Sequence, residues 1–101
     1  MKVKVPKTLQ IASFRYTLGF AELNDNHHLL GQCRNDKQQM VFEPNLTQQT
    51  KDQALWHEVL HAIDTCYSCK LEEEEIDRTA QGITAVLKND FGIEFDWEDI
   101  K

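Results

Sequence analysis

The pentad His57-Glu58-Val59-Leu60-His61 combines residue types that can bind a metal ion and move a proton. On an α-helix, residues four apart lie on the same face, so His57 and His61 can offer ring nitrogens to one ion. Paired imidazoles at this spacing are typical of tetrahedral Zn²⁺ sites. Glu58 lies about 100° round the helix from His57, beside the ion, where it can accept a proton from water. The pattern therefore predicts Zn²⁺ as the cofactor and Glu58 as a catalytic general base.

The sequence around the pentad favours the helix that this chemistry requires. Apolar residues recur at helical spacing through it, namely Leu55, Val59, Ala62 and Ile63. We expect an α-helix over residues 47–65, with Asn45 or Thr47 as its N-cap. The two histidines fall at the border of the apolar face, where a half-buried ion fits. The alternative interpretation is a pair of surface histidines that binds no metal.

A third protein ligand must come from elsewhere in the chain, because a catalytic zinc site usually has three protein ligands and a water. We predict a second helix over residues 71–88, and its first turn contains four consecutive glutamates. Glu73 is followed four residues later by Asp77, whose carboxylate can orient a ligand histidine. We therefore predict Glu73 as the third ligand, with Glu72 and Glu75 as reserves. The alternative is a solvated first turn that the helix dipole favours.

The length of the chain indicates one domain spanning residues 1–101. Charged residues make up 28% of the chain and hydrophobic residues 41%, as in an ordinary globular domain. The net charge of −6 argues against a nucleic-acid partner, since such partners are bound by clustered Lys and Arg. We expect a cytoplasmic protein, because no apolar run has the length of a membrane span or a signal peptide.

The strand-like patterns predict a small β-sheet that precedes the two helices in the chain. It should occupy about residues 2–43, with polar turns such as Asn24-Asp25-Asn26 between its strands. The tail, residues 89–101, alternates weakly and is expected to form either a short extra strand or an extended arm. The stretches with strand-like patterns are residues 2–5, residues 9–20 with a slip or bulge at Ala12-Ser13, residues 28–34 and residues 38–43.

The three cysteines allow a competing metal site. Cys66 and Cys69 have the Cys-x-x-Cys spacing of zinc and redox sites, and His61 lies close to them in sequence. There is no second such pair, and Cys33 is the only other thiol. An odd number of cysteines fits reduced thiols better than a disulfide framework. The simpler interpretation is therefore two reduced thiols in a connection between helices.

The pentad and the second helix together resemble the ImmA/IrrE-type metallopeptidase family, whose members carry His-Glu-x-x-His followed by a helix reading Glu-x-x-Ala-Asn/Asp-x-Phe-Ala. The corresponding helix here runs from Glu73 to Ala80, with Ile76 in place of the family's Ala and Thr79 in place of its Phe. The resemblance covers about residues 38–88. It is strongest to short phage- or prophage-encoded members, which carry Trp/Leu-His-Glu-x-x-His-Ala as residues 56–62 do.

This resemblance implies a minimal gluzincin-like α+β domain, in which a small antiparallel three-stranded sheet packs on two helices with zinc between them. It also implies a peptide substrate along a sheet edge formed by residues 38–43. Family members with an assigned activity cut repressor proteins. The expected function is thus hydrolysis of peptide bonds by water that zinc activates. An oxyanion donor is also needed, and Tyr67 or the pair His27-His28 can supply one.

Two further classes of function stay open. The chain can be a catalytically silent module of a phage or mobile element that binds a partner protein, with zinc serving structure or absent. It can also be a toxin, antitoxin or inhibitor-like protein. A homodimer or a complex with a partner protein is a further expectation, because a chain of this size has little surface for a substrate groove.

Overall fold

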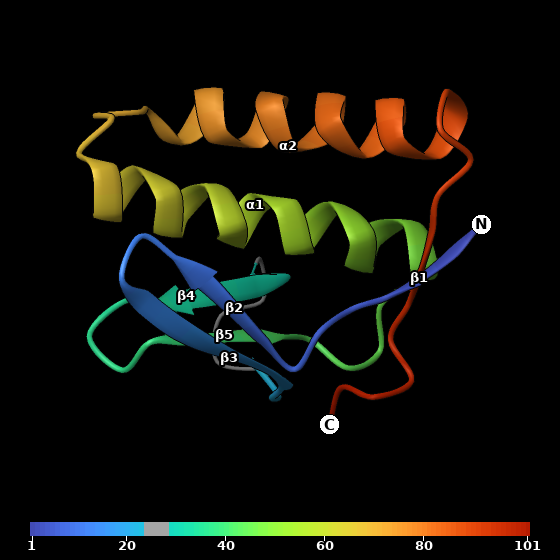
Figure 1. Cartoon of the computed structure of the whole chain (residues 1–101), viewed down its shortest axis with the longest axis horizontal. Coiled ribbons are helices and arrows are strands. Elements are labelled where there is room, and N and C mark those ends of the chain that lie inside the picture. Colours follow the sequence, from blue (N-terminus) through green and yellow to red (C-terminus); the bar gives the residue numbers. More distant parts are fainter. Residues whose placement is uncertain (24–28) are drawn as a thin grey trace.

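Helix α1 (Gln48–Tyr67) lies between a β-sheet on one side and α2 (Glu73–Asn89) on the other in the computed structural model (Figure 1). The structure describes residues 1–23 and 29–101, so the predicted turn at Asn24-Asp25-Asn26 lies outside the described residues. Within the described part, no helix has the length and apolar character needed to cross a bilayer.

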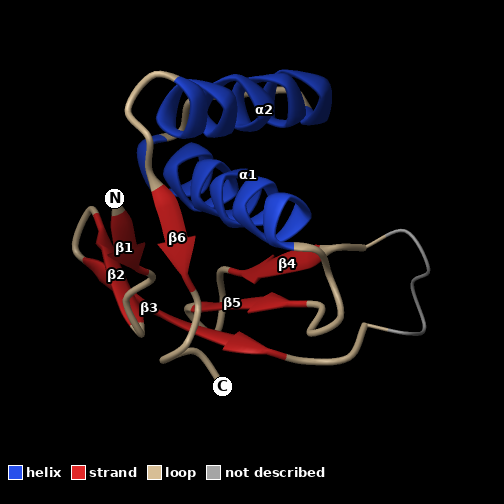
Figure 2. Cartoon of the chain, turned by 90° about the vertical axis from the view of Figure 1, so that its right-hand side faces the viewer, coloured by secondary structure: helices blue, strands red, loops and turns tan. Residues whose placement is uncertain are grey.

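The main sheet is mixed and four-stranded, with the order β2-β3-β5-β4 (Figure 2). Its antiparallel pairs are β2 with β3 and β4 with β5, whereas β3 and β5 run parallel. The prediction of an α+β fold with two helices is therefore confirmed, and the prediction of a three-stranded antiparallel sheet is wrong. The strands are β2 (Thr8–Ile11), β3 (Phe14–Phe20), β4 (Gly31–Arg34) and β5 (Gln39–Phe42).

The extra strand arises at Ala12-Ser13, where a two-residue turn replaces the predicted bulge. Ile11 pairs directly with Phe14 across this turn, and Ala12 has a left-handed backbone with φ of 56°. Such a conformation is uncommon for alanine. Ala12-Ser13 also contains no Gly or Asn, the residues that usually signal a hairpin turn in a sequence. The parallel pair arises because the β4–β5 hairpin places its second strand, β5, next to β3.

The two ends of the chain form a second, smaller sheet. Strand β1 (Lys2–Lys4) pairs in parallel with β6 (Glu94–Asp96), so the tail forms the short strand that was one of its two expected states. The N-terminal ammonium also donates to the carbonyl oxygen of Gly92 at 2.8 Å. These contacts join the N-terminus to residues 92–96, which pass the first turn of α1, where Gln48 Nε2 donates to the carbonyl oxygen of Phe95 at 2.6 Å (Figure 1).

The hydrophobic core lies between the main sheet and α1. Helix α2 contributes few buried residues, because it packs on α1 alone and buries Ile76, Ala80 and Thr84. Apolar contacts between α1 and the sheet therefore hold the helix that carries the pentad. The buried core residues of these elements and the tail include Tyr16, Met40, Phe42, Leu55, Val59, Ala62, Trp97 and Ile100.

The ends of α1 follow local signals. Thr47 is the N-cap, since its Oγ1 accepts from the backbone N–H of Thr50 at 3.3 Å, which selects it over Asn45. The helix ends at Tyr67, two residues beyond the predicted end, and Ser68 then adopts a left-handed conformation with φ of 53°. The pentad therefore lies in the middle of a regular helix.

Asp52, on α1, is a carboxylate buried in the core. It is 8% exposed and accepts hydrogen bonds from Trp97 Nε1 at 2.8 Å and from Gln48 Nε2 at 3.0 Å. Burial raises the pKa of Asp52 above its ordinary value, although these two donors oppose the rise.

A raised pKa in the folded protein makes stability depend on pH. The contribution of Asp52 is fully present below its unfolded pKa and is lost as pH rises through its folded pKa. Asp52→Asn removes this titration. As the pH rises from about 3 to about 7, the free energy of unfolding of the variant should therefore increase relative to that of the parent. Urea unfolding at both pH values measures the difference. A constant difference, or a shift in favour of the parent, would contradict this prediction.

Candidate metal centre

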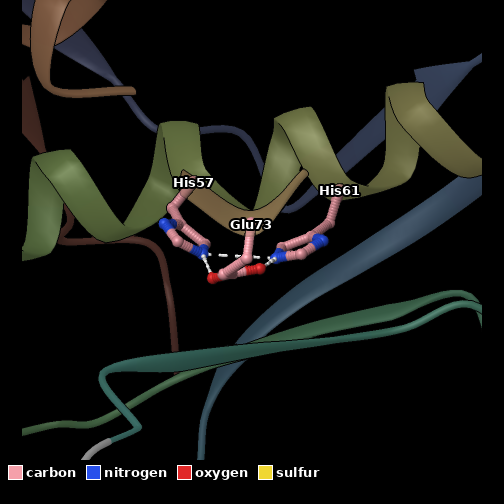
Figure 3. Close-up of side chains that lie close together, drawn as sticks. All are labelled: His57, His61 and Glu73. Carbon is pink, nitrogen blue, oxygen red and sulfur yellow. Dashed lines mark hydrogen bonds and ion pairs between the residues drawn. The ribbon is translucent and has the colours of Figure 1, made fainter. Parts of the chain in front are cut away.

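The first turn of α2 brings Glu73 against the two histidines of α1 (Figure 3). His57 Nε2 lies 2.8 Å from one carboxylate oxygen of Glu73, and His61 Nε2 lies 3.0 Å from the other. The two Nε2 atoms are 3.2 Å apart. All three side chains predicted from the sequence as ligands therefore point toward one centre between the helices.

This cluster can hold a metal ion. One ligand atom from each of the three residues lies within 4.8 Å of the other two. Ligands at about 2.1 Å from a tetrahedral ion are about 3.4 Å apart, close to the distances observed between these atoms. Two imidazoles and one carboxylate form a donor set that zinc accepts, with a fourth position open to a small ligand. The residues therefore fit the ion that the sequence predicts.

Asp77 favours the histidine tautomer that a metal needs. Its Oδ1 lies 3.4 Å from Nδ1 of His57, on the side of the ring away from Glu73. A carboxylate there favours a proton on Nδ1, which leaves a lone pair on Nε2. That lone pair would face a carboxylate oxygen of Glu73 at 2.8 Å, a repulsive contact unless a cation or proton lies between them. The arrangement therefore suits a bound cation.

The other three glutamates of the α2 run have different contacts. Glu72 and Glu75 form a capping box, in which the backbone N–H of Glu72 donates to Glu75 Oε1 at 2.7 Å. Glu74 pairs with Arg78 at 3.5 Å on an exposed face. Glu72 and Glu75, the alternative ligands, therefore cap the N-terminus of α2, and Glu73 is the glutamate of the run that reaches the histidines.

Glu58 lies beside the cluster, packed against strand β4. Its side chain is buried, with the residue 5% exposed, and the backbone of Cys33 lies beside its carboxylate. A Cβ on Gly31 would lie 3.2 Å from both Cγ and Oε2 of Glu58, so the absence of a side chain there makes room for the carboxylate. Burial raises the pKa of Glu58 to about 7, while the neighbouring His57 lowers it.

Two adjoining cavities, of about 240 Å³ and about 370 Å³, lie beside Glu58 and the His57–His61–Glu73 cluster. His57, Glu58 and Glu73 line both, and the second also reaches His61. Their other wall is β4 with residues on either side of it, so His57 and Glu73 face a strand across the cavity. The residues of this wall are Leu29, Leu30, Gly31, Gln32, Cys33 and Asn35.

Strand β4 is the edge of the main sheet nearest the metal ligands. The sequence-based prediction gave this place to residues 38–43, and it is wrong, because β5 lies inside the sheet between β3 and β4. The error follows from the hairpin order, which puts the earlier of the two strands on the outside. Gly31 and Cys33 were also missed as site residues. Their only sequence signal is a glycine at the start of a strand.

The competing cysteine site does not form. Among residues 1–23 and 29–101, the group of three or more potential ligands that converges is His57, His61 and Glu73, without Cys66 or Cys69. Tyr67 is 60% exposed at the end of α1 and does not line either cavity. The other proposed oxyanion donors, His27 and His28, lie outside the described residues.

Comparisons of the chain with protein-family models, curated proteins and solved structures found no match. The case for function therefore depends on the geometry of the site itself and on the motif that the sequence carries.

Proposed function

We propose that this chain is a zinc-dependent metallopeptidase, with His57, His61 and Glu73 as the metal ligands and Glu58 as the general base. The observation that carries the proposal is the convergence of three ligand side chains, in the wall of a cavity that also contains a buried, non-ligand carboxylate. A site built only to hold an ion does not need this fourth group. Hydrolysis by metal-assisted attack of water does.

Glu58 and Asp77 have different roles in the proposed reaction. Zinc, when bound, supplies Lewis-acid polarisation of a carbonyl group and lowers the pKa of water. Glu58 accepts the proton of the attacking water and returns it to the leaving amine. Asp77 keeps the His57 ring in its ligand orientation.

The substrate class follows from the strand that forms the cavity wall. Among the described residues, strand β4 pairs with β5 on one side and with no strand on the other, so its free edge can accept an extended peptide by strand addition. A peptide lying there would place its backbone across the cavity from His57 and His61. The resemblance of residues 57–61 and 73–80 to the ImmA/IrrE-type family supports a peptide substrate by analogy, and the structure supports an extended one.

A second function has its own supporting observation. Helix α2 buries only Ile76, Ala80 and Thr84, all against α1, and an ion between His57, His61 and Glu73 would join these two helices. A metal can therefore serve to hold α2 in place in a protein-binding module without hydrolysis. Both functions require the same ligands, and they differ in whether Glu58 and the open coordination position are used.

The proposal is tested on protein purified without added metal. We expect about one zinc per chain by elemental analysis. A chelator should lower the melting temperature by several degrees, because the ion binds only the folded state. We also expect cleavage of a mixed peptide library that the chelator abolishes and added zinc restores. Zinc binding without cleavage would favour the interaction module, and the absence of any bound divalent metal would reject both functions.

A further inference from the structure

Asn35 lies in the wall of the metal cavity although no part of the proposed mechanism uses it. It follows β4 in the chain and lines the larger cavity together with Glu58 and His61. Its Nδ2 donates to Thr65 Oγ1 at 3.2 Å. Thr65 is four residues after His61 on α1, so Asn35 lies about one helical turn beyond that ligand.

A buried network fixes the acceptor end of the Asn35 side chain. The hydroxyl of Tyr16, a residue only 2% exposed, donates to Asn35 Oδ1 at 2.7 Å. The Cys33 thiol donates to the same oxygen at 3.5 Å. Cys66 Sγ lies 3.6 Å from the Tyr16 hydroxyl oxygen and can donate to it in turn. Tyr16 and Cys33 both face Oδ1, and the nitrogen lies at the other end of the carboxamide, toward Thr65.

The donor end of Asn35 bonds to an exposed residue, Thr65, whereas its acceptor end is more enclosed. The Tyr16–Asn35 hydrogen bond is partly buried, whereas the Asn35–Thr65 hydrogen bond is exposed. A carboxamide nitrogen carries two N–H donors, and Thr65 takes one. Among residues 1–23 and 29–101, this nitrogen makes no second hydrogen bond. Three neighbours therefore hold a donor rigidly, with one N–H unused, in the wall of the cavity.

We propose that Asn35 is a ligand-binding residue, whose second Nδ2–H donates to a main-chain carbonyl oxygen of a peptide that lies along β4. This inference rests on the proposed function, and it adds a contact at a distance from the ion. The hydrogen bond is made to the peptide main chain, so it contributes affinity for extended peptides of many sequences. It also sets the register, because the peptide must place a carbonyl oxygen at Asn35 while another group faces the ligands His57 and His61.

Two hydroxamates on the cobalt(II)-loaded protein test the inference without measuring hydrolysis. Acetohydroxamate is short and reaches only the ion, whereas a hydroxamate of a capped alanyl dipeptide extends along β4. The visible spectrum of cobalt reports binding of each. We expect Asn35→Asp to weaken the dipeptide hydroxamate about 5–30-fold, the effect of losing one well-placed hydrogen bond, and to leave acetohydroxamate within about twofold.

Asn35→Asp keeps the acceptor oxygen that Tyr16 uses and removes the donor, so the fold should survive; thermal melting checks it. Asn89→Asp is the matched control, because it makes the same chemical change at an exposed residue at the end of α2 that lines neither cavity, and it should bind both probes like the parent. Equal loss of both probes in Asn35→Asp, or no loss of either, would overturn the role of Asn35. Failure of the parent to bind the dipeptide more tightly than acetohydroxamate would also overturn it. Failure to bind cobalt would instead reject the metal site and the proposed function with it.

Discussion

Replacing Glu58 with glutamine is expected to reduce peptide hydrolysis at least about 100-fold while zinc stays bound at the parent stoichiometry. A positioned general base contributes roughly 10²–10⁴-fold to such a reaction, and an amide cannot accept the proton. Glu58 does not belong to the ligand cluster, so the variant leaves the donors of His57, His61 and Glu73 in place. Hydrolysis of a cleavable library peptide and zinc content are measured on the same preparation.

Glu74→Gln is the matched control for this experiment. It removes a carboxylate by the same chemical change, but Glu74 lies on the exposed face of α2 and pairs only with Arg78 at 3.5 Å. Its hydrolysis rate should equal the parent's. Glu58→Gln should also fold normally, because burial already favours the neutral form of this side chain. Parent-level cleavage by Glu58→Gln would show that another group takes the proton and would remove the mechanistic basis of the proposal.

The ligand set could be predicted from the sequence because each part of it depends on local geometry. The spacing of His57 and His61 needs only a helix, and the apolar pattern around them specifies one. The choice of Glu73 among four glutamates also depends on a single helix, since Asp77 lies on the same face four residues on. The structure brings the three residues together because α1 and α2 are joined by a short connection that leaves them antiparallel and adjacent.

The sheet could not be predicted to the same extent, because its topology depends on pairing between strands far apart in sequence. The turn at Ala12-Ser13 has no sequence signal, since a left-handed alanine is tolerated only where the surrounding sheet stabilises it. The order that puts β5 inside the sheet and β4 at its edge comes from contacts of β5 with β3. The hairpin itself was predicted correctly, but residues 38–43 were taken as its edge strand, whereas β4 is the strand that faces His57 and Glu73.

The residues around Glu58 were missed for a related reason. Gly31 and Cys33 act through their backbone and through the space that they leave, and neither property produces a pattern in sequence. Asn35 reads as an ordinary turn residue, as does any asparagine after a strand. Its placement becomes visible only when Tyr16 and Thr65, from other elements, are found to bond to it.

The second large effect is expected at the third ligand, where Glu73→Gln should weaken zinc binding more than about 100-fold. Loss of a group that merely supports a ligand costs roughly 10–100-fold in metal affinity, and removal of the ligand charge should exceed this range. Glutamine keeps the size of the side chain, but its amide is a weaker donor to zinc than a carboxylate. Competition with a chromophoric chelator measures the affinity, and Glu74→Gln again serves as the control with the parent's value.

The neighbours of Glu73 decide whether the effect is specific to one position. Glu72 and Glu75 cap the helix, so Glu75→Gln should keep the parent's zinc affinity and cost α2 at most a few tenths of a kcal/mol. Asp77→Asn should fall between the two, with a loss of roughly 10-fold, because it weakens the orientation of the His57 ring without removing a ligand. This order of effects is what a metal centred on His57, His61 and Glu73 requires. Equal losses at Glu73 and Glu75 would point to a diffuse attraction between zinc and the acidic turn, and parent-level affinity in Glu73→Gln would move the third ligand elsewhere.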